Sequence, residues 1–257
     1  MRKEASLAMF TCVMAAFASF ARWMQNNNIY ESSTGLAVPS VWSSVMIAVC
    51  VVAIIGLIFL TYRLKSFNAG TEYRTALRAR TIMFPIAAIV LGVGMAVGAL
   101  MLIRNRDNIM YPHLNLILAV FAILCGASFP VLALGPKKDG SDVLVCLCAA
   151  IPVLFFCYWL VISYRENSTD PVLWAFAFEI LALCGATLGF YYLAGYAFRR
   201  VKPLHTVFFT QLGAFLCTVV LGDNRIMGKQ VFFLMSGIML LMQSTVLVAR
   251  MTKETRT

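Results

Sequence analysis

The strongest constraint on this chain is a series of apolar runs, each about as long as a lipid bilayer is thick. A helix needs about 20 mostly apolar residues to cross the hydrocarbon core, and eight runs of the sequence meet that length. Backbone groups in lipid must hydrogen-bond within their own segment, so the runs are predicted to be membrane-spanning helices. They cover approximately residues 6–24, 38–61, 81–103, 112–134, 143–163, 171–197, 204–222 and 230–249.

Composition excludes the other broad classes of protein. Hydrophobic residues make up 61% of the 257 positions and charged residues 12%, whereas soluble domains hold about 45–50% apolar and about 25% charged residues. So few charges cannot cover a surface that faces water. We therefore expect an all-α, polytopic integral membrane bundle of eight transmembrane helices, which forms a single domain over residues 1–257.

Basic residues are distributed unevenly between the connections, and this predicts the orientation. With eight crossings, 15 of the 21 lysines and arginines fall on the side of the N-terminus and 6 on the other side. Short connections rich in Lys and Arg stay in the cytoplasm, so we expect a multi-pass protein of the cell membrane with both termini cytoplasmic. The cytoplasmic connections, residues 62–80 above all, would contact anionic lipid headgroups. The net charge of +10 then needs no nucleic-acid partner.

The first run allows a second interpretation. Basic residues at positions 2–3 precede an apolar stretch with small residues at Ala16 and Ala18, as in a cleaved signal peptide. The apolar stretch continues beyond that point and ends in Arg22 and Trp23, an interfacial anchor pattern that favours a retained helix. Cleavage would leave seven helices in the same orientation.

Tryptophan placement agrees with this layout. All the tryptophans fall near the non-cytoplasmic ends of predicted helices, which predicts an aromatic belt at that interface. They are Trp23, Trp42, Trp159 and Trp174.

A tandem repeat pairs the third and fourth helices with the fifth and sixth. When the sequence is shifted by 59 residues, Arg106-Asp107-Asn108 falls on Arg165-Glu166-Asn167 without a gap, and 9 of 29 positions over residues 106–134 are identical. The polar loop makes the match credible, since apolar helices alone often match by chance. Both hairpins enter from the same side, so the repeat is parallel, unlike the inverted repeats of many transporters.

Glu179 is the most informative single residue. It lies about eight residues into the sixth helix, roughly 10–12 Å below the interface at 1.5 Å per residue. A charged group at depth is expensive and usually faces a cavity or a partner. Asn115, near the outer start of the fourth helix, matches its depth best, and we interpret Glu179 and Asn115 as a candidate polar site for a proton, a cation or a polar ligand. The alternative is a neutral carboxylic acid that hydrogen-bonds a neighbouring helix.

The repeated loop motif suggests a second site on the outer face. Its basic residues could form a cationic vestibule for an anionic ligand, and its acids could carry lipid chemistry. The alternative is that the arginines extend to the interface and pair with the neighbouring acids. The candidate residues are Arg104, Arg106, Asp107, Arg165 and Glu166.

No cofactor is expected from the ligand-type residues. Every one of the eight cysteines lies in an apolar run, where cysteine behaves as a small hydrophobe. The two histidines, His113 and His205, belong to opposite membrane faces, so this chain alone cannot assemble a paired-histidine haem or zinc site from them. Sequence signatures of hydrolases, zinc proteases and nucleotide-binding enzymes are also missing.

The leading functional hypothesis is a small transporter, permease component or channel-like subunit, with a small molecule or an ion as substrate at Glu179. The first alternative is a membrane-embedded binding, sensor or scaffold subunit that works through a protein partner or as a homo-oligomer. The second is a lipid-active membrane enzyme that uses Asp107 or Glu166.

Overall fold

The structure is a computed structural model that describes residues 3–28, 41–68, 70, 72–77, 81–105, 111–136, 143–167 and 173–253. Within these residues, eight helices are long and apolar enough to cross a membrane, which confirms the predicted all-helical bundle. They are α1 (Lys3–Asn28), α2 (Val41–Arg63), α4 (Met83–Arg104), α5 (Pro112–Leu134), α6 (Val143–Asn167), α7 (Leu173–Ala197), α8 (Pro203–Val219) and α9 (Met227–Arg250).

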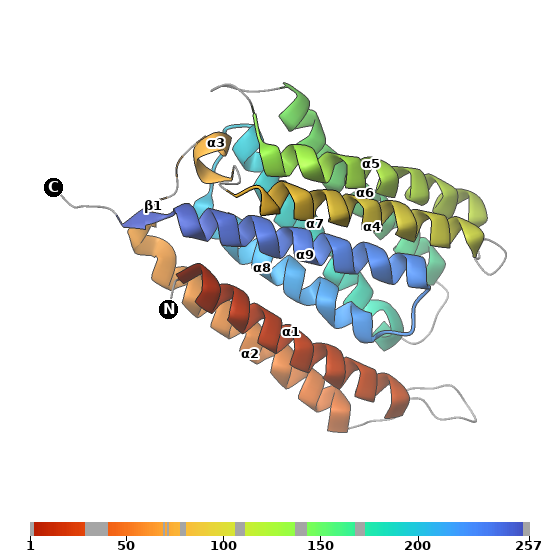
Figure 1. Cartoon of the computed structure of the whole chain (residues 1–257). Helices are drawn as coiled ribbons and strands as arrows, with labels where there is room; N and C mark the ends of the chain where they lie inside the picture. Colours follow the sequence, from red (N-terminus) through yellow and green to blue (C-terminus); the bar gives the residue numbers. More distant parts are fainter. Residues whose placement is uncertain are drawn as a thin grey trace.

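The long helices lie side by side, with the first two set apart from the rest (Figure 1). Helices α4 to α9 form the main bundle, and the α1–α2 hairpin packs along α8, with α1 also touching α9. The start of α1 and the end of α9 lie at the same end of the bundle (Figure 1). We call this the proximal end, and the opposite end, where α1 ends and α9 begins, the distal end. The cytoplasmic placement of the termini and the hairpin repeat stay predictions.

Close backbone approach sets the tightest helix contacts. A Cβ added at Gly126 of α5 would lie 2.6 Å from the Gly92 carbonyl oxygen of α4 and 2.9 Å from the Met95 Cβ. A Cβ at Gly213 of α8 would lie 2.8 Å from the Gly185 carbonyl oxygen of α7. Small residues at such positions let helices in lipid gain van der Waals contact. Gly126 and Gly185 occupy equivalent positions in the predicted repeat. Gly126 nevertheless approaches α4, whereas Gly185 approaches α8, and these two helices are not equivalent in the repeat.

A short segment of the predicted 62–80 connection folds onto the proximal end. Helix α3 (Tyr73–Ala76) buries Tyr73, and the Tyr73 hydroxyl donates a hydrogen bond of 2.7 Å to the Leu132 carbonyl oxygen of α5. Strand β1 (Phe67–Asn68) pairs antiparallel with β2 (Thr252–Lys253), which ties this segment to the end of α9. The connection is thus part of the bundle rather than only a basic loop over lipid.

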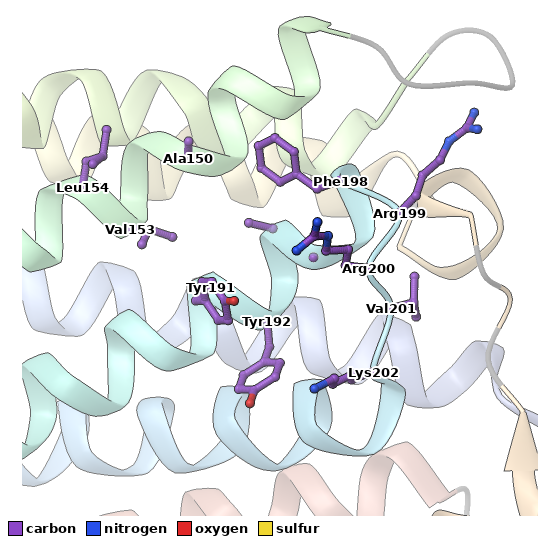
Figure 2. Close-up of a pocket in the computed structure, with 12 residues that line it drawn as sticks. Ala150, Val153, Leu154, Tyr191, Tyr192, Phe198, Arg199, Arg200, Val201 and Lys202 are labelled. Carbon is purple, nitrogen blue, oxygen red and sulfur yellow. The ribbon is translucent and has the colours of Figure 1, made fainter.

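One groove opens on the side of the bundle. It lies between α6 and the turn from α7 to α8, near the proximal end (Figure 2).

Burial corrects the predicted tryptophan belt. Trp23 is 51% exposed, as an interfacial anchor should be, but Trp159 is fully buried in the main bundle. The predicted belt depends only on the position of each tryptophan along its helix. Rotation about the helix axis decides whether a side chain at that depth meets lipid or the core, and an apolar run carries almost no signal of rotation.

We expect Gly126→Ala to destabilise the bundle by about 1–3 kcal/mol, the usual effect of overpacking. Alanine is the better helix former, so the sign of the change reports the α4–α5 contact. The measurement is thermal unfolding in detergent, and Val120→Ala on the lipid-facing side of α5 is the control. A Gly126→Ala variant as stable as wild type would contradict the close approach.

Candidate functional site

Six charged side chains gather between the helices at the distal end. An ionised group taken out of water costs several kcal/mol unless it is paired and hydrogen-bonded, so these side chains need partners of opposite charge close by. The structure joins them into three ion pairs, which we call the ionic layer. Its members are Arg22, Glu166, Glu179, Asp223, Arg225 and Lys229.

The first pair joins α1 to the connection between α8 and α9. Arg22 is 1% exposed, and its Nε donates to Asp223 Oδ1 at 2.5 Å. Its Nη1 donates to Gln25 Oε1 at 2.9 Å, and its guanidinium lies 4.7 Å from the centre of the Phe178 ring in α7. Asn26 Nδ2 also donates to Asp223 Oδ1, at 2.9 Å. Each charge of the pair is therefore neutralised by its partner and held by further polar contacts.

Helical spacing explains why α1 supplies this group. Residues three and four apart share one face of a helix, so Arg22, Gln25 and Asn26 point together from the last turns of α1. The chain opposite is very close: a Cβ at Gly222 would lie 2.5 Å from the Ser19 carbonyl oxygen. Only glycine lets the 3₁₀ turn after α8 (Val220–Gly222) come near enough for Asp223 to reach Arg22.

The second pair holds Glu179. Its carboxylate is 2% exposed, and Oε2 lies 3.2 Å from Arg225 Nη2. The Arg225 side chain is 23% exposed, so this pair connects a buried acid of α7 to the distal surface. Glu179 directly follows Phe178, whose ring lies under the Arg22 guanidinium, so the first two pairs lie at the same level along α7.

Asn115 contacts the third pair of the ionic layer and not Glu179, its predicted partner. Lys229 Nζ of α9 donates to Glu166 Oε2 of α6 at 2.5 Å. Asn115 Nδ2 of α5 donates to Glu166 Oε1 at 2.7 Å and to the Tyr111 carbonyl oxygen at 3.1 Å. Asn115 thus hydrogen-bonds Glu166, whereas the Glu179 carboxylate forms an ion pair with Arg225.

The predicted outer-face residues are divided by the structure. Glu166 is drawn into the ionic layer, and Arg104 is exposed at the end of α4. Arg165 is exposed, with its guanidinium 4.8 Å from the centre of the Tyr111 ring. Arg106 and Asp107 lie outside the described residues.

Two acceptor atoms of this region are left over. Asp223 Oδ2 and Asn115 Oδ1 are buried and have no hydrogen-bond partner among the described residues. Buried polar atoms are nearly always paired with protein or with water. The ionic layer is balanced in charge, with three cations and three carboxylates. Its two unpartnered oxygens can accept a hydrogen bond from a hydroxyl, an ammonium group or a water, or can contact a cation.

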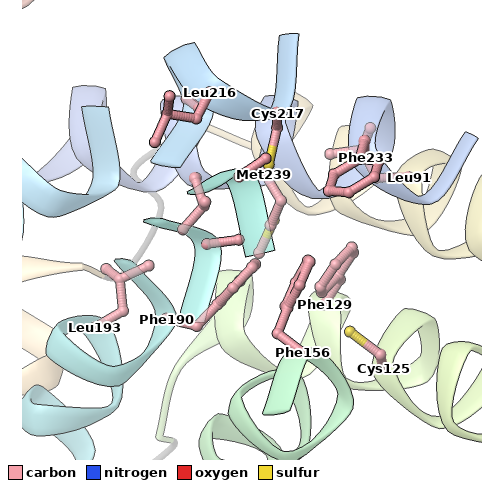
Figure 3. Packing of buried hydrophobic residues seen from close by; sticks show 14 of the residues in the cluster. Leu91, Cys125, Phe129, Phe156, Phe190, Leu193, Leu216, Cys217, Phe233 and Met239 are labelled. Carbon is pink, nitrogen blue, oxygen red and sulfur yellow. The ribbon is translucent and has the colours of Figure 1, made fainter. Parts of the chain in front are cut away.

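An aromatic block fills the core below the ionic layer. Trp159 and Phe233 lie one to two helical turns from Glu166 and Lys229, and their rings are 4.3 Å apart. Phe156 and Phe190 stack at 5.6 Å, and Phe190 and Phe129 at 6.1 Å, which continues the block toward the proximal half (Figure 3). These side chains come from α5, α6, α7 and α9, and all are buried.

Polar groups return on the proximal side of that block. Gln211 Nε2 of α8 donates to Ser244 Oγ of α9 at 3.0 Å, whereas both amide atoms of Gln243 are buried without a partner among the described residues. Gln243 and Tyr73 line a cavity of about 10 Å³, close to the volume that one water needs. Burial raises the pKa of Tyr73 above its usual range, which keeps its hydroxyl a proton donor.

Sequence reasoning did not predict Arg22, Asp223, Arg225 or Lys229 as site residues; it interpreted Arg22 as an interfacial anchor. The sequence carries only a weak signal. The connections assigned to that side hold six basic and five acidic residues, so opposite charges are available there to pair.

The part of the chain that the structure describes contains no group of three or more His, Cys, Asp or Glu residues that could hold a metal ion. All eight cysteines are free thiols.

Comparison with protein-family models, with curated proteins and with solved structures finds no match.

We expect Asp223→Asn to lower the free energy of unfolding by about 3–5 kcal/mol, because it leaves the Arg22 guanidinium buried without its counter-charge. Combining it with Arg22→Met removes both charges, and the double variant should be more stable than the sum of the single effects predicts. Thermal unfolding in detergent measures all three, with Arg63→Met on the exposed end of α2 as control. Single variants as stable as the control would contradict a buried, mutually dependent pair.

Proposed function

We propose that this integral membrane protein is a small transporter, permease component or channel-like subunit, and that its ionic layer around Glu179 takes part in moving a small polar solute or an ion. The observation that carries the proposal is the gathering of six charged side chains into three ion pairs at the distal end, with four of the six buried. Ionisable groups within membrane-spanning segments are expensive, and they commonly mark substrate or ion pathways.

The order of layers along the bundle supports this proposal. Ion pairs lie at the distal end, aromatic rings close the middle, and unpartnered amide and hydroxyl groups follow on the proximal side. The arrangement is that expected of an occluded path, in which polar groups at the two ends would contact a solute in turn. The unpartnered oxygens of Asp223 and Asn115 favour a solute that donates hydrogen bonds or carries positive charge.

Charge distribution supports an orientation for the path. The proximal end would be cytoplasmic, because 15 of the 21 basic residues belong to that side when the chain crosses the membrane eight times. The ionic layer would then face the outside of the cell membrane.

A second candidate function is a membrane-embedded sensor or scaffold subunit. It is favoured by the position of the α1–α2 hairpin, which lies outside the main bundle, packs along α8 and is joined to the connection after α8 by the buried Arg22–Asp223 ion pair (Figure 1). A partner that breaks this contact could move the hairpin. Lipid chemistry at Glu166 has less support, because Lys229 and Asn115 already occupy both carboxylate oxygens.

The test is flux through the purified protein in liposomes. We expect proton or Na⁺ flux, followed with a trapped pH-sensitive or Na⁺-sensitive dye, that falls about tenfold or more in Glu179→Gln, since the loss of about 1.4 kcal/mol corresponds to a factor of ten. The substitution removes the charge but keeps the size of the side chain.

The matched control is Glu72→Gln, which changes an exposed acid at the proximal end. Equal flux in wild type and Glu179→Gln would remove Glu179 from the path. No flux of either ion in wild type, together with a stable complex on native purification, would favour the subunit alternative.

A further inference from the structure

The groove at the proximal end is a distinct feature from the ionic layer. It has a volume of about 1110 Å³ and is lined by α6, by the last turns of α7 and by the turn that leads into α8. Pockets for drug-sized ligands usually measure about 300–1,000 Å³. The groove is therefore large enough for a long, partly apolar molecule.

The walls of the groove face lipid. Leu154 of α6 is 56% exposed, Tyr191 of α7 is 59% exposed and Phe198 is 53% exposed. Both helices are apolar spans, so surface exposed along them lies against acyl chains. Tyrosine has an apolar ring and a polar tip, and it is enriched where a membrane meets water. In a membrane the groove would therefore open sideways onto lipid, with its tyrosines toward the interface.

The end of α7 places three cations at this level. Arg199 adopts a left-handed conformation, with φ of 56°, and the Arg200 backbone N–H donates to the Gly195 carbonyl oxygen at 2.7 Å, which ends the helix. Lys202 follows directly before Pro203 starts α8. Arg200 and Lys202 point toward the side where Tyr191 and Tyr192 lie, whereas Arg199 points away (Figure 2).

These cations are free to bind an anion. Arg199, Arg200 and Lys202 are exposed, and none of them forms an ion pair with an acid in the part of the chain that the structure describes. This contrasts with Arg22, Arg225 and Lys229 at the distal end, each of which has a carboxylate partner.

We infer that the groove binds one anionic phospholipid of the proximal leaflet. Its phosphate lies between Arg200 and Lys202, and an acyl chain follows Val153 and Leu154 along α6. Charge complementarity selects the headgroup, since basic pockets between membrane helices bind anionic lipids. The sideways opening onto apolar surface selects a lipid over free phosphate. The inference does not depend on transport.

Native mass spectrometry of the protein released from mixed micelles tests this site. With phosphatidylglycerol and phosphatidylcholine at equal concentration, wild type should retain phosphatidylglycerol in preference by roughly tenfold or more, as two cation contacts imply. Arg200→Gln combined with Lys202→Gln should abolish the preference. Arg63→Gln, at an exposed cation at the end of α2, should keep it.

A second variant separates the groove from the charges. Ala150→Trp fills the groove and leaves the cations in place, so it should lower retention of phosphatidylglycerol. If the double variant does not fold, this variant still tests whether the lipid occupies the groove. Equal retention of the two lipids by wild type would overturn the inference. So would unchanged retention in Ala150→Trp, or displacement of the lipid by millimolar inorganic phosphate, which would identify a site for the free anion.

Discussion

The distal end of this bundle depends on one constraint: charges buried between apolar helices must neutralise each other. Arg22 and Glu179 are almost completely buried, so each relies on a counter-charge from another helix or connection. The three pairs draw on α1, α6, α7, α9 and the connection between α8 and α9. Lipid tails are as apolar as leucine, so helices in lipid associate through close packing and polar contacts rather than through a hydrophobic driving force. The ion pairs therefore add to the specificity that the close glycine contacts of α4–α5 and α7–α8 give to the helix arrangement.

This constraint also links architecture to the proposed function. A pair that only stabilises could be replaced by well-packed apolar residues with little loss. The ionic layer instead keeps unpartnered oxygens on Asp223 and Asn115, and Arg225 reaches the surface. A donor or cation that arrives there would compete for carboxylates that now hold helices together. Binding would then loosen α1 or α7, and this is the coupling that a transport cycle or a sensor requires.

Sequence reasoning recovered the eight long helices, because the length of an apolar run reports directly on a span. It identified Glu179 and Asn115 as polar residues at depth but not their partners, and it assigned Trp159 to an interface that its buried ring does not reach. Partners depend on how each helix is rotated about its axis, and an apolar run of near-uniform composition gives little information on rotation. The Arg22–Asp223 contact joins residues 201 positions apart, which no local pattern indicates.

The most direct measurement exchanges the charges of one pair. Glu166→Lys and Lys229→Glu are each introduced alone and then together, and folded protein is measured by size-exclusion chromatography and thermal unfolding. Each single change places like charges side by side, and we expect little folded protein. The double variant should recover most of the wild-type stability, since the unpartnered Asn115 Oδ1 can accept from the new ammonium group. Single variants that fold normally, or a double variant no better than either, would contradict the account.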